Sequence, residues 1–145
     1  MKKPPILLLI LSTMLLGACS VIEGANQSVQ YVEQTQAYMN SLAQFAEQAP
    51  QMMKEAATNP ETFQKLEDRV IKVKEDILQF NAANAPAIAK DLHQQLTDKN
   101  KLLLDEVNQA LENGHLALDK LQNSEIVNTI QDVTGLVNRI ENLGL

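Results

Sequence analysis

Apolar side chains recur at alternating spacings of three and four residues over the stretch 63–80, which leaves little choice of local structure. The residues concerned are Phe63, Leu66, Val70, Val73, Ile77 and Phe80. This spacing places all of them on one face of an α-helix. The segment Asn59-Pro60-Glu61 supplies a helix start: an N-cap, a proline at the first helical position and an acid in the first turn. Ile71 and Leu78 widen the stripe beyond that of a two-stranded coiled coil, which indicates a helix of a bundle.

Three further stretches show the helical period and supply partners for this face. They run over about residues 27–49, over 86–113, and from Ser124 to near Gly144. Their inward positions are Tyr31, Tyr38, Leu42, Phe45 and Ala49, flanked by Val32 and Met39; Ala89, Leu92, Leu96, Leu103, Val107 and Ala110; and Ile126, Ile130, Val133, Val137 and Ile140. Because the break at Ala83–Pro86 is short, the helices on either side should be antiparallel. The sequence therefore predicts an all-α fold, an antiparallel bundle of four long helices, with a three-helix core plus a looser first helix as the alternative.

The ends of these helices are marked by proline and glycine. Pro50 either starts a short new turn or kinks the first helix. Asn113-Gly114 is expected to stop the third helix, because glycine tolerates the left-handed cap conformation. Residues 115–123 then form a connector with room for one helical turn, and no segment shows the sustained alternation of a strand.

The chain opens like a secretory signal peptide. Lys2 and Lys3 precede an apolar run from Ile6 to Leu16 and then small residues. The run ends in Leu16-Gly17-Ala18-Cys19, which resembles the lipobox of bacterial lipoproteins, where the cysteine thiol receives a diacylglyceryl group. The alternatives are an ordinary secretory signal and a membrane-spanning helix. The second would need about 20 apolar residues, and the stretch from Ile6 to Ala18 is 13 residues long and is interrupted by Ser12 and Thr13.

The lipobox resemblance gives each of its residues a role. The Cys19 thiol accepts the lipid, Leu16 fills an apolar subsite of the signal peptidase, and the small Gly17 and Ala18 fit its narrow cleft. Cleavage before Cys19 divides the chain into the signal peptide (1–18), the lipidated cysteine with a short tether (19–26), and the bundle domain (27–145). The tether contains the helix breaker Gly24 and spans at most about 25 Å, so the domain is expected to lie close to the bilayer.

Composition limits the partners of the mature chain. Removal of residues 1–18 takes away Lys2 and Lys3, so that ten basic and 18 acidic residues remain, a net charge of −8. Anionic membrane surfaces and nucleic acids should repel such a surface, so the lipid is the expected membrane contact and no nucleic acid is expected. Cys19 is the only cysteine, which leaves none to form an intrachain disulfide.

The residues suited to chemistry form no recognisable catalytic set. His93 lies on the polar flank of the third predicted helix, where we expect it to be solvated. Glu112 and His115 have the Glu-x-x-His spacing of di-iron bundles, but such sites need two copies and further glutamates. The neighbours in Glu67-Asp68 and in Glu75-Asp76 do not face each other on a helix. Nucleophile-elbow, phosphate-loop and zinc-helix motifs are absent from the sequence. We expect no enzyme, no cofactor and no metal.

The overall layout, including the stretch Phe80–His93, is similar to a family of small uncharacterised Bacillus-type lipoproteins that carry a domain of unknown function. The resemblance implies no catalytic residue and no ligand. It implies a host with a single membrane, with the protein held on the outer face of the cytoplasmic membrane. In a host with two membranes, Ser20 after the cysteine would leave sorting to the outer membrane open.

Two functions remain for such a chain. The first is a non-enzymatic helical module, anchored in the membrane through Cys19, that contacts another cell-envelope protein. The alternative is a bundle that binds a small apolar or amphiphilic ligand, which would require an enclosed apolar pocket of roughly 300 Å³ or more.

Overall fold

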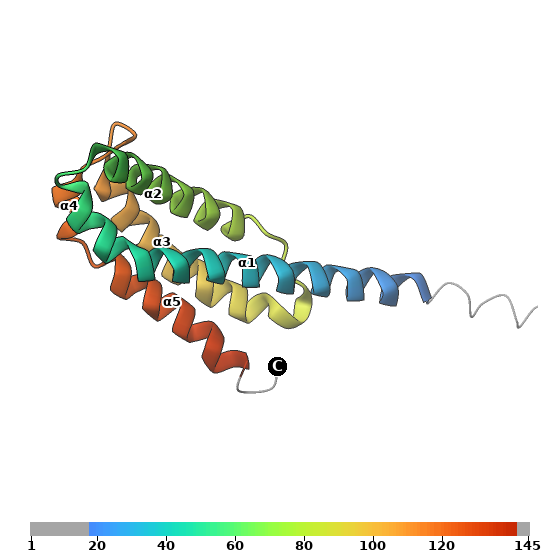
Figure 1. Cartoon of the computed structure of the whole chain (residues 1–145). Coiled ribbons are helices and arrows are strands. Elements are labelled where there is room, and N and C mark those ends of the chain that lie inside the picture. Colours follow the sequence, from blue (N-terminus) through green and yellow to red (C-terminus); the bar gives the residue numbers. More distant parts are fainter. Residues whose placement is uncertain (1–17, 142–145) are drawn as a thin grey trace, which may run out of the picture.

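The computed structural model describes the backbone of residues 18–141 and the side chains of residues 26–137. Four long helices run alternately up and down: α1 (Ala18–Ala56), α2 (Pro60–Asn81), α3 (Lys90–Ala110) and α5 (Ile126–Glu141) (Figure 1). Helix α1 packs against α2 and α5, and α3 packs against the same two helices from the other side. The predicted antiparallel four-helix bundle is confirmed.

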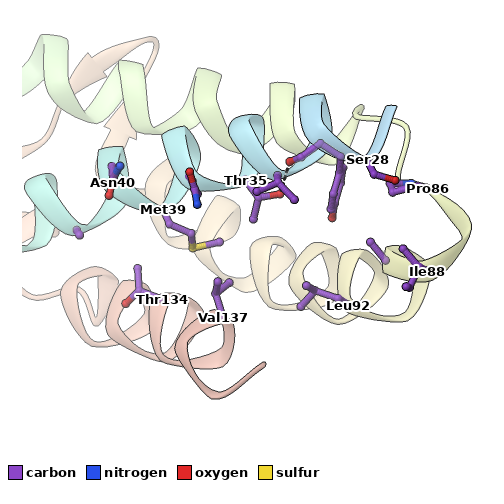
Figure 2. A pocket seen from close by; sticks show the side chains of 14 residues that line it. Ser28, Thr35, Met39, Asn40, Pro86, Ile88, Leu92, Thr134 and Val137 are labelled. Carbon is purple, nitrogen blue, oxygen red and sulfur yellow. Dashed lines mark hydrogen bonds between the residues drawn. The ribbon is translucent and has the colours of Figure 1, made fainter. Parts of the chain in front are cut away.

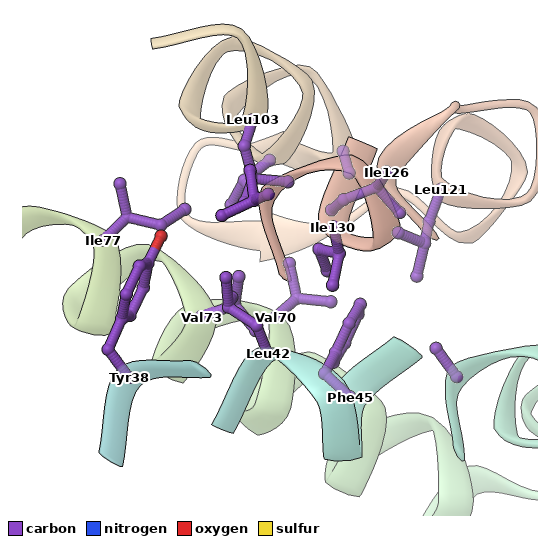
Figure 3. Close-up of a cluster of buried hydrophobic side chains, with 14 of the residues drawn as sticks. Tyr38, Leu42, Phe45, Val70, Val73, Ile77, Leu103, Leu121, Ile126 and Ile130 are labelled. Atoms are coloured by element: carbon purple, nitrogen blue, oxygen red, sulfur yellow. The ribbon is translucent and has the colours of Figure 1, made fainter. Parts of the chain in front are cut away.

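The core consists mainly of the predicted apolar faces, and the side chain of Ile140, predicted to point inward, lies outside the described residues. In α2, Leu66, Val70, Val73, Ile77 and Phe80 are buried, and they meet buried residues of the other three long helices (Figure 3). All five inward positions predicted for the first helix are also buried, so α1 is a full member of the bundle over this part. The alternative with a loosely packed first helix is therefore wrong for the part of α1 from Tyr31 to Ala49. Val32 and Leu78, predicted to flank the core, are instead exposed.

Helix α2 begins as the sequence predicts. The Asn59 side-chain oxygen accepts hydrogen bonds from the backbone N–H groups of Glu61, at 3.0 Å, and Thr62, at 3.2 Å. Pro60 occupies the first turn. These contacts satisfy donors that have no partner within the helix.

Helix α1 is longer than predicted at both ends. It continues through Pro50 to Ala56, so the predicted new turn at Pro50 is wrong. A proline inside a helix removes one backbone hydrogen bond, and burial of Ala49 and Ala56 on either side offsets this loss. The expected tether is also helical, because α1 already begins at Ala18 and includes Gly24. The first part of α1 (blue) extends past the ends of the other helices (Figure 1).

The third helix ends earlier than predicted, at Ala110, and a small hairpin follows it. Strands β1 (Leu111–Glu112) and β2 (His115–Leu116) pair antiparallel, so that Glu112 lies opposite His115. Asn113 and Gly114 form the turn with φ angles of 51° and 85°. Two successive positive φ angles are typical of a two-residue hairpin turn, for which Asn-Gly is a favoured pair. Asn113-Gly114 is thus a hairpin turn rather than a helix stop.

Short helical pieces complete the connections. The 3₁₀ helix η2 (Ala87–Ala89) leads into α3, and α4 (Leu118–Gln122) lies between β2 and α5. The one helical turn predicted within residues 115–123 is confirmed as α4. Leu121 of α4 is buried and closes the core at the hairpin end of the bundle.

The buried carboxylate of Glu67 fixes the hairpin to α2. It accepts a hydrogen bond from the Leu116 backbone N–H at 2.7 Å, and its other oxygen lies 3.6 Å from His115 Nδ1. The bond from the Leu116 N–H holds the pKa of Glu67 below its ordinary value, against the opposing effect of burial. An acid whose pKa is lower in the folded state than in the unfolded state stabilises the fold at pH values above its ordinary pKa. This contribution is lost as the pH falls through the pKa of the folded state.

We expect Glu67→Gln to lower the free energy of unfolding at pH 7 by about 1 kcal/mol, because glutamine keeps the acceptor but loses the charge-assisted bond. The difference from wild type should close as the pH falls below about 4.5, the ordinary pKa of the group. Urea unfolding between pH 7 and pH 3 measures it. The exposed neighbour Asp68, changed to Asn, is the control and should have a smaller effect. If Glu67→Gln lowers the free energy of unfolding by the same amount over this whole pH range, the stabilising role of the ionised Glu67 is contradicted.

Candidate functional site

The most distinctive surface feature is a groove between α1, α3 and α5 (Figure 2). Its volume is about 590 Å³. Helix α1 supplies one wall, the α2–α3 connection and the start of α3 supply the second, and α5 supplies the third. The lining residues are Ser28, Tyr31, Val32, Thr35, Gln36, Met39, Asn40, Ala43, Pro86, Ile88, Ala89, Leu92, Thr134 and Val137.

The lining of the groove is uncharged and mainly apolar. Among the described residues that line it there is no Asp, Glu, Lys, Arg or His, although charged residues make up 21% of the chain. The groove is accessible from solvent, since Val32 is 51% exposed and Ile88 is 83% exposed. Figure 2 shows Asn40 and Thr134 at the end away from Pro86 and Ile88. The groove thus offers apolar walls with a few neutral polar groups, an arrangement typical of sites for uncharged molecules.

The polar groups of the inner wall are used within the protein. The Thr35 hydroxyl donates to the Tyr31 carbonyl oxygen at 2.8 Å, and the Tyr31 hydroxyl lies 3.1 Å from His93 Nδ1. Burial raises the pKa of Tyr31, so its phenol stays neutral over the ordinary pH range. These contacts hold the Tyr31 and Thr35 side chains in place within the wall.

His93 is not the solvated side chain that the sequence predicts. It is half-buried, and its ring lies 5.7 Å from the ring of Tyr31 and 5.1 Å from that of Phe80. Tyr38 stacks on the other side of the cluster, 4.5 Å from Phe80. The prediction failed because α1, far away in the sequence, brings Tyr31 over the flank of α3.

A second polar group that the sequence did not reveal is buried beneath this cluster. Asn100 is fully buried and accepts a hydrogen bond from the Tyr38 hydroxyl at 2.6 Å. Its amide donates to the side-chain oxygen of Asn81 at 2.8 Å. Asn100 lies between Leu96 and Leu103 on the inward face of α3. Its place in this apolar pattern is the feature of the sequence from which its burial could have been predicted. Because these polar groups satisfy one another, the network links three helices and offers no open ligand position.

A second hollow lies between α1 and α2, with a volume of about 630 Å³. Its main polar group is Asp76, which accepts hydrogen bonds from the Ser41 hydroxyl at 2.6 Å and from Lys72 Nζ at 2.9 Å. The carboxylate is therefore already paired with a hydroxyl and an ammonium group. This hollow resembles a solvated seam between two helices.

The two residues with the Glu-x-x-His spacing of di-iron sites lie on the hairpin. Glu112 and His115 face each other across its strands rather than along a helix. Over the described part of the chain, no group of three or more His, Cys, Asp or Glu side chains is placed to hold a metal ion.

The residues of the expected lipidation site lie at the edge of the structure. Leu16 and Gly17 are outside the described residues; Ala18 and Cys19 begin α1, and their side chains are also outside the description. Between residues 18 and 141, no helix combines the length and the apolar character needed to cross a bilayer.

Comparisons with known proteins agree with the sequence resemblance. Residues 31–143 match the model of a family of unknown function, DUF6376. The chain is also 26% identical over 131 residues to the uncharacterized lipoprotein YybP of Bacillus subtilis (strain 168), a match that covers 88% of each chain. No solved structure matches. The predicted resemblance to small uncharacterised Bacillus-type lipoproteins is confirmed, and the matched region includes all of the groove except Ser28.

Proposed function

We propose that this chain, which belongs to the family of unknown function DUF6376, is a membrane-anchored lipoprotein that binds an apolar or amphiphilic molecule without chemically changing it. The anchor is a diacylglyceryl group on the Cys19 thiol. Recognition of Leu16-Gly17-Ala18 and removal of residues 1–18 then leave the lipidated cysteine at the N-terminus. Two observations support it: the N-terminal sequence, and the similarity to a protein named as a lipoprotein. Two acyl chains meet the requirement for stable membrane attachment. The protein would then lie on the outer face of the cytoplasmic membrane.

The uncharged groove carries the binding proposal. Its volume, about 590 Å³, exceeds the roughly 300 Å³ that a small-ligand site requires. It differs from the expected enclosed pocket because it opens along the exposed side chains of Val32 and Ile88. The described lining offers hydroxyl and amide groups but no carboxylate, imidazole, amine or thiol, which favours binding over catalysis. Contact with another envelope protein stays a prediction.

Binding can be measured with Nile red, a neutral dye whose emission shifts to the blue in apolar surroundings. We expect the Cys19→Ala protein, which lacks the acyl chains of the anchor, to bind the dye in the groove. Val32→Asp in this background should weaken binding at least tenfold, because the added carboxylate must be desolvated when the dye enters. Fluorescence titration gives both dissociation constants.

Val29→Asp is the matched control. Val29 is 58% exposed one turn earlier on the same helix and does not line the groove. The Val29→Asp substitution introduces the same charge at a similarly exposed position outside the groove, so it should leave the affinity for Nile red unchanged. Equal weakening by the two substitutions, or the absence of a blue shift in the parent protein, would contradict binding in the groove.

A further inference from the structure

The groove begins close to the expected membrane anchor. Ser28, at its near end, follows Cys19 by nine residues on the continuous helix α1, which corresponds to about 14 Å along the axis. The same end is bordered by Pro86 and by Ile88, whose side chain is 83% exposed (Figure 2). If Cys19 carries the anchor, this apolar end of the groove is the end nearest the bilayer surface.

The dimensions of the groove suit a single acyl chain. Its α1 wall runs from Ser28 to Ala43, about 22 Å at the helical rise. One leaflet of the hydrocarbon core is about 15 Å thick, so a membrane acyl chain can lie along the groove without folding back on itself. The volume of about 590 Å³ is also within the usual range for sites of small ligands.

The charge of the groove also favours an acyl chain. The mature chain has a net charge of −8 by sequence, yet the described lining of the groove holds no charged side chain. An amphipathic peptide helix usually carries charges that need partners at the rim of its groove. An acyl chain needs only apolar contact, which Val32, Leu92 and Val137 provide.

The protein's own anchor is poorly suited to be this occupant. Stable attachment needs both acyl chains on Cys19 in the bilayer, and placing one of them in the groove would leave a single chain, which binds a membrane only marginally and reversibly. We infer that the groove holds one acyl chain of a separate membrane lipid, lifted from the bilayer beside the anchor. This inference rests on the proposed function and specifies its ligand.

Photocrosslinking in intact cells tests the inference. Cells expressing the full chain are fed a fatty acid that carries a diazirine and an alkyne, so that their membrane lipids become photoreactive. After illumination, the protein is isolated and its crosslinked peptides are identified by mass spectrometry. We expect a lipid adduct on peptides that contain groove residues, with a yield at least fivefold lower in Val32→Asp and in Ile88→Asp. Val29→Asp should give the wild-type yield. Because all three positions are highly exposed, misfolding would not explain a loss of crosslinking yield.

The peptide masses separate the possible sources of an adduct. A groove peptide joined to one lipid and nothing else supports the inference. A groove peptide joined to the Cys19 peptide through the anchor would overturn it in favour of the protein's own acyl chain. A groove peptide joined to another protein, or no groove adduct while Nile red still binds, would overturn the inference that a lipid occupies the groove. The proposed function would remain. Loss of both the adduct and Nile red binding would reject both.

Discussion

Leu42→Ala is expected to lower the free energy of unfolding by about 2–5 kcal/mol, the usual cost of truncating a leucine in a core. Leu42 is fully buried in α1, and Figure 3 shows it pointing toward Val70 and Val73 of α2. The loss combines the transfer free energy of the deleted carbon atoms with the cavity left behind. Urea unfolding followed by circular dichroism measures it, with Leu103→Ala, at a fully buried position of α3, for comparison.

Val32→Ala is the control for this prediction. Val32 is on the same helix but exposed, and substitutions at such positions usually change stability by less than about 0.5 kcal/mol. If α1 is a full member of the bundle, Leu42→Ala and Leu103→Ala will have similar effects. A cost for Leu42→Ala below about 1 kcal/mol would instead indicate a loosely attached first helix.

Much of the fold could be predicted because its information is local. The spacing of apolar residues in α2 identifies its buried face, and Asn59-Pro60 identifies its first turn. The same period gives the buried faces of the other long helices. Short connections then restrict the helices to an antiparallel arrangement.

The errors arose where one local signal permits two structures. Asn-Gly favours positive φ angles, which serve both a helix stop and a hairpin turn. The structure adopts the hairpin, and Glu67, far away in the sequence, stabilises it by accepting the Leu116 N–H. Pro50 and Gly24 likewise weaken a helix without ending it, and both lie inside α1.

The candidate site could not be predicted because no single helix contains it. The groove depends on how α1, α3 and α5 are placed relative to one another, and the period of one helix says nothing about that placement. The contact of His93 with Tyr31 has the same origin, since the two residues are 62 positions apart. The lipidation of Cys19 is, in contrast, a prediction from a pattern that is continuous in the sequence.

Cys19→Ala is expected to have the largest effect on location. The thiol is the group that would accept the diacylglyceryl chain, and alanine has no nucleophile to replace it. The unlipidated protein is acidic, with a net charge of −6 for the full chain and −8 without residues 1–18, so it would have no electrostatic attraction to an anionic membrane surface. Incorporation of radiolabelled palmitate should fall to background, and the protein should leave the membrane fraction. Ser20→Ala, at the next position, should retain both the label and the membrane location.

The position of the groove beside the bilayer depends on the modification of Cys19, and the N-terminal peptide of the protein isolated from membranes tests this directly. Mass spectrometry should find that the mature chain begins at Cys19 and carries the mass of a diacylglyceryl group. An N-terminus elsewhere, or an unmodified Cys19 in the membrane-bound protein, would contradict the anchor and remove the basis for placing the groove at the membrane.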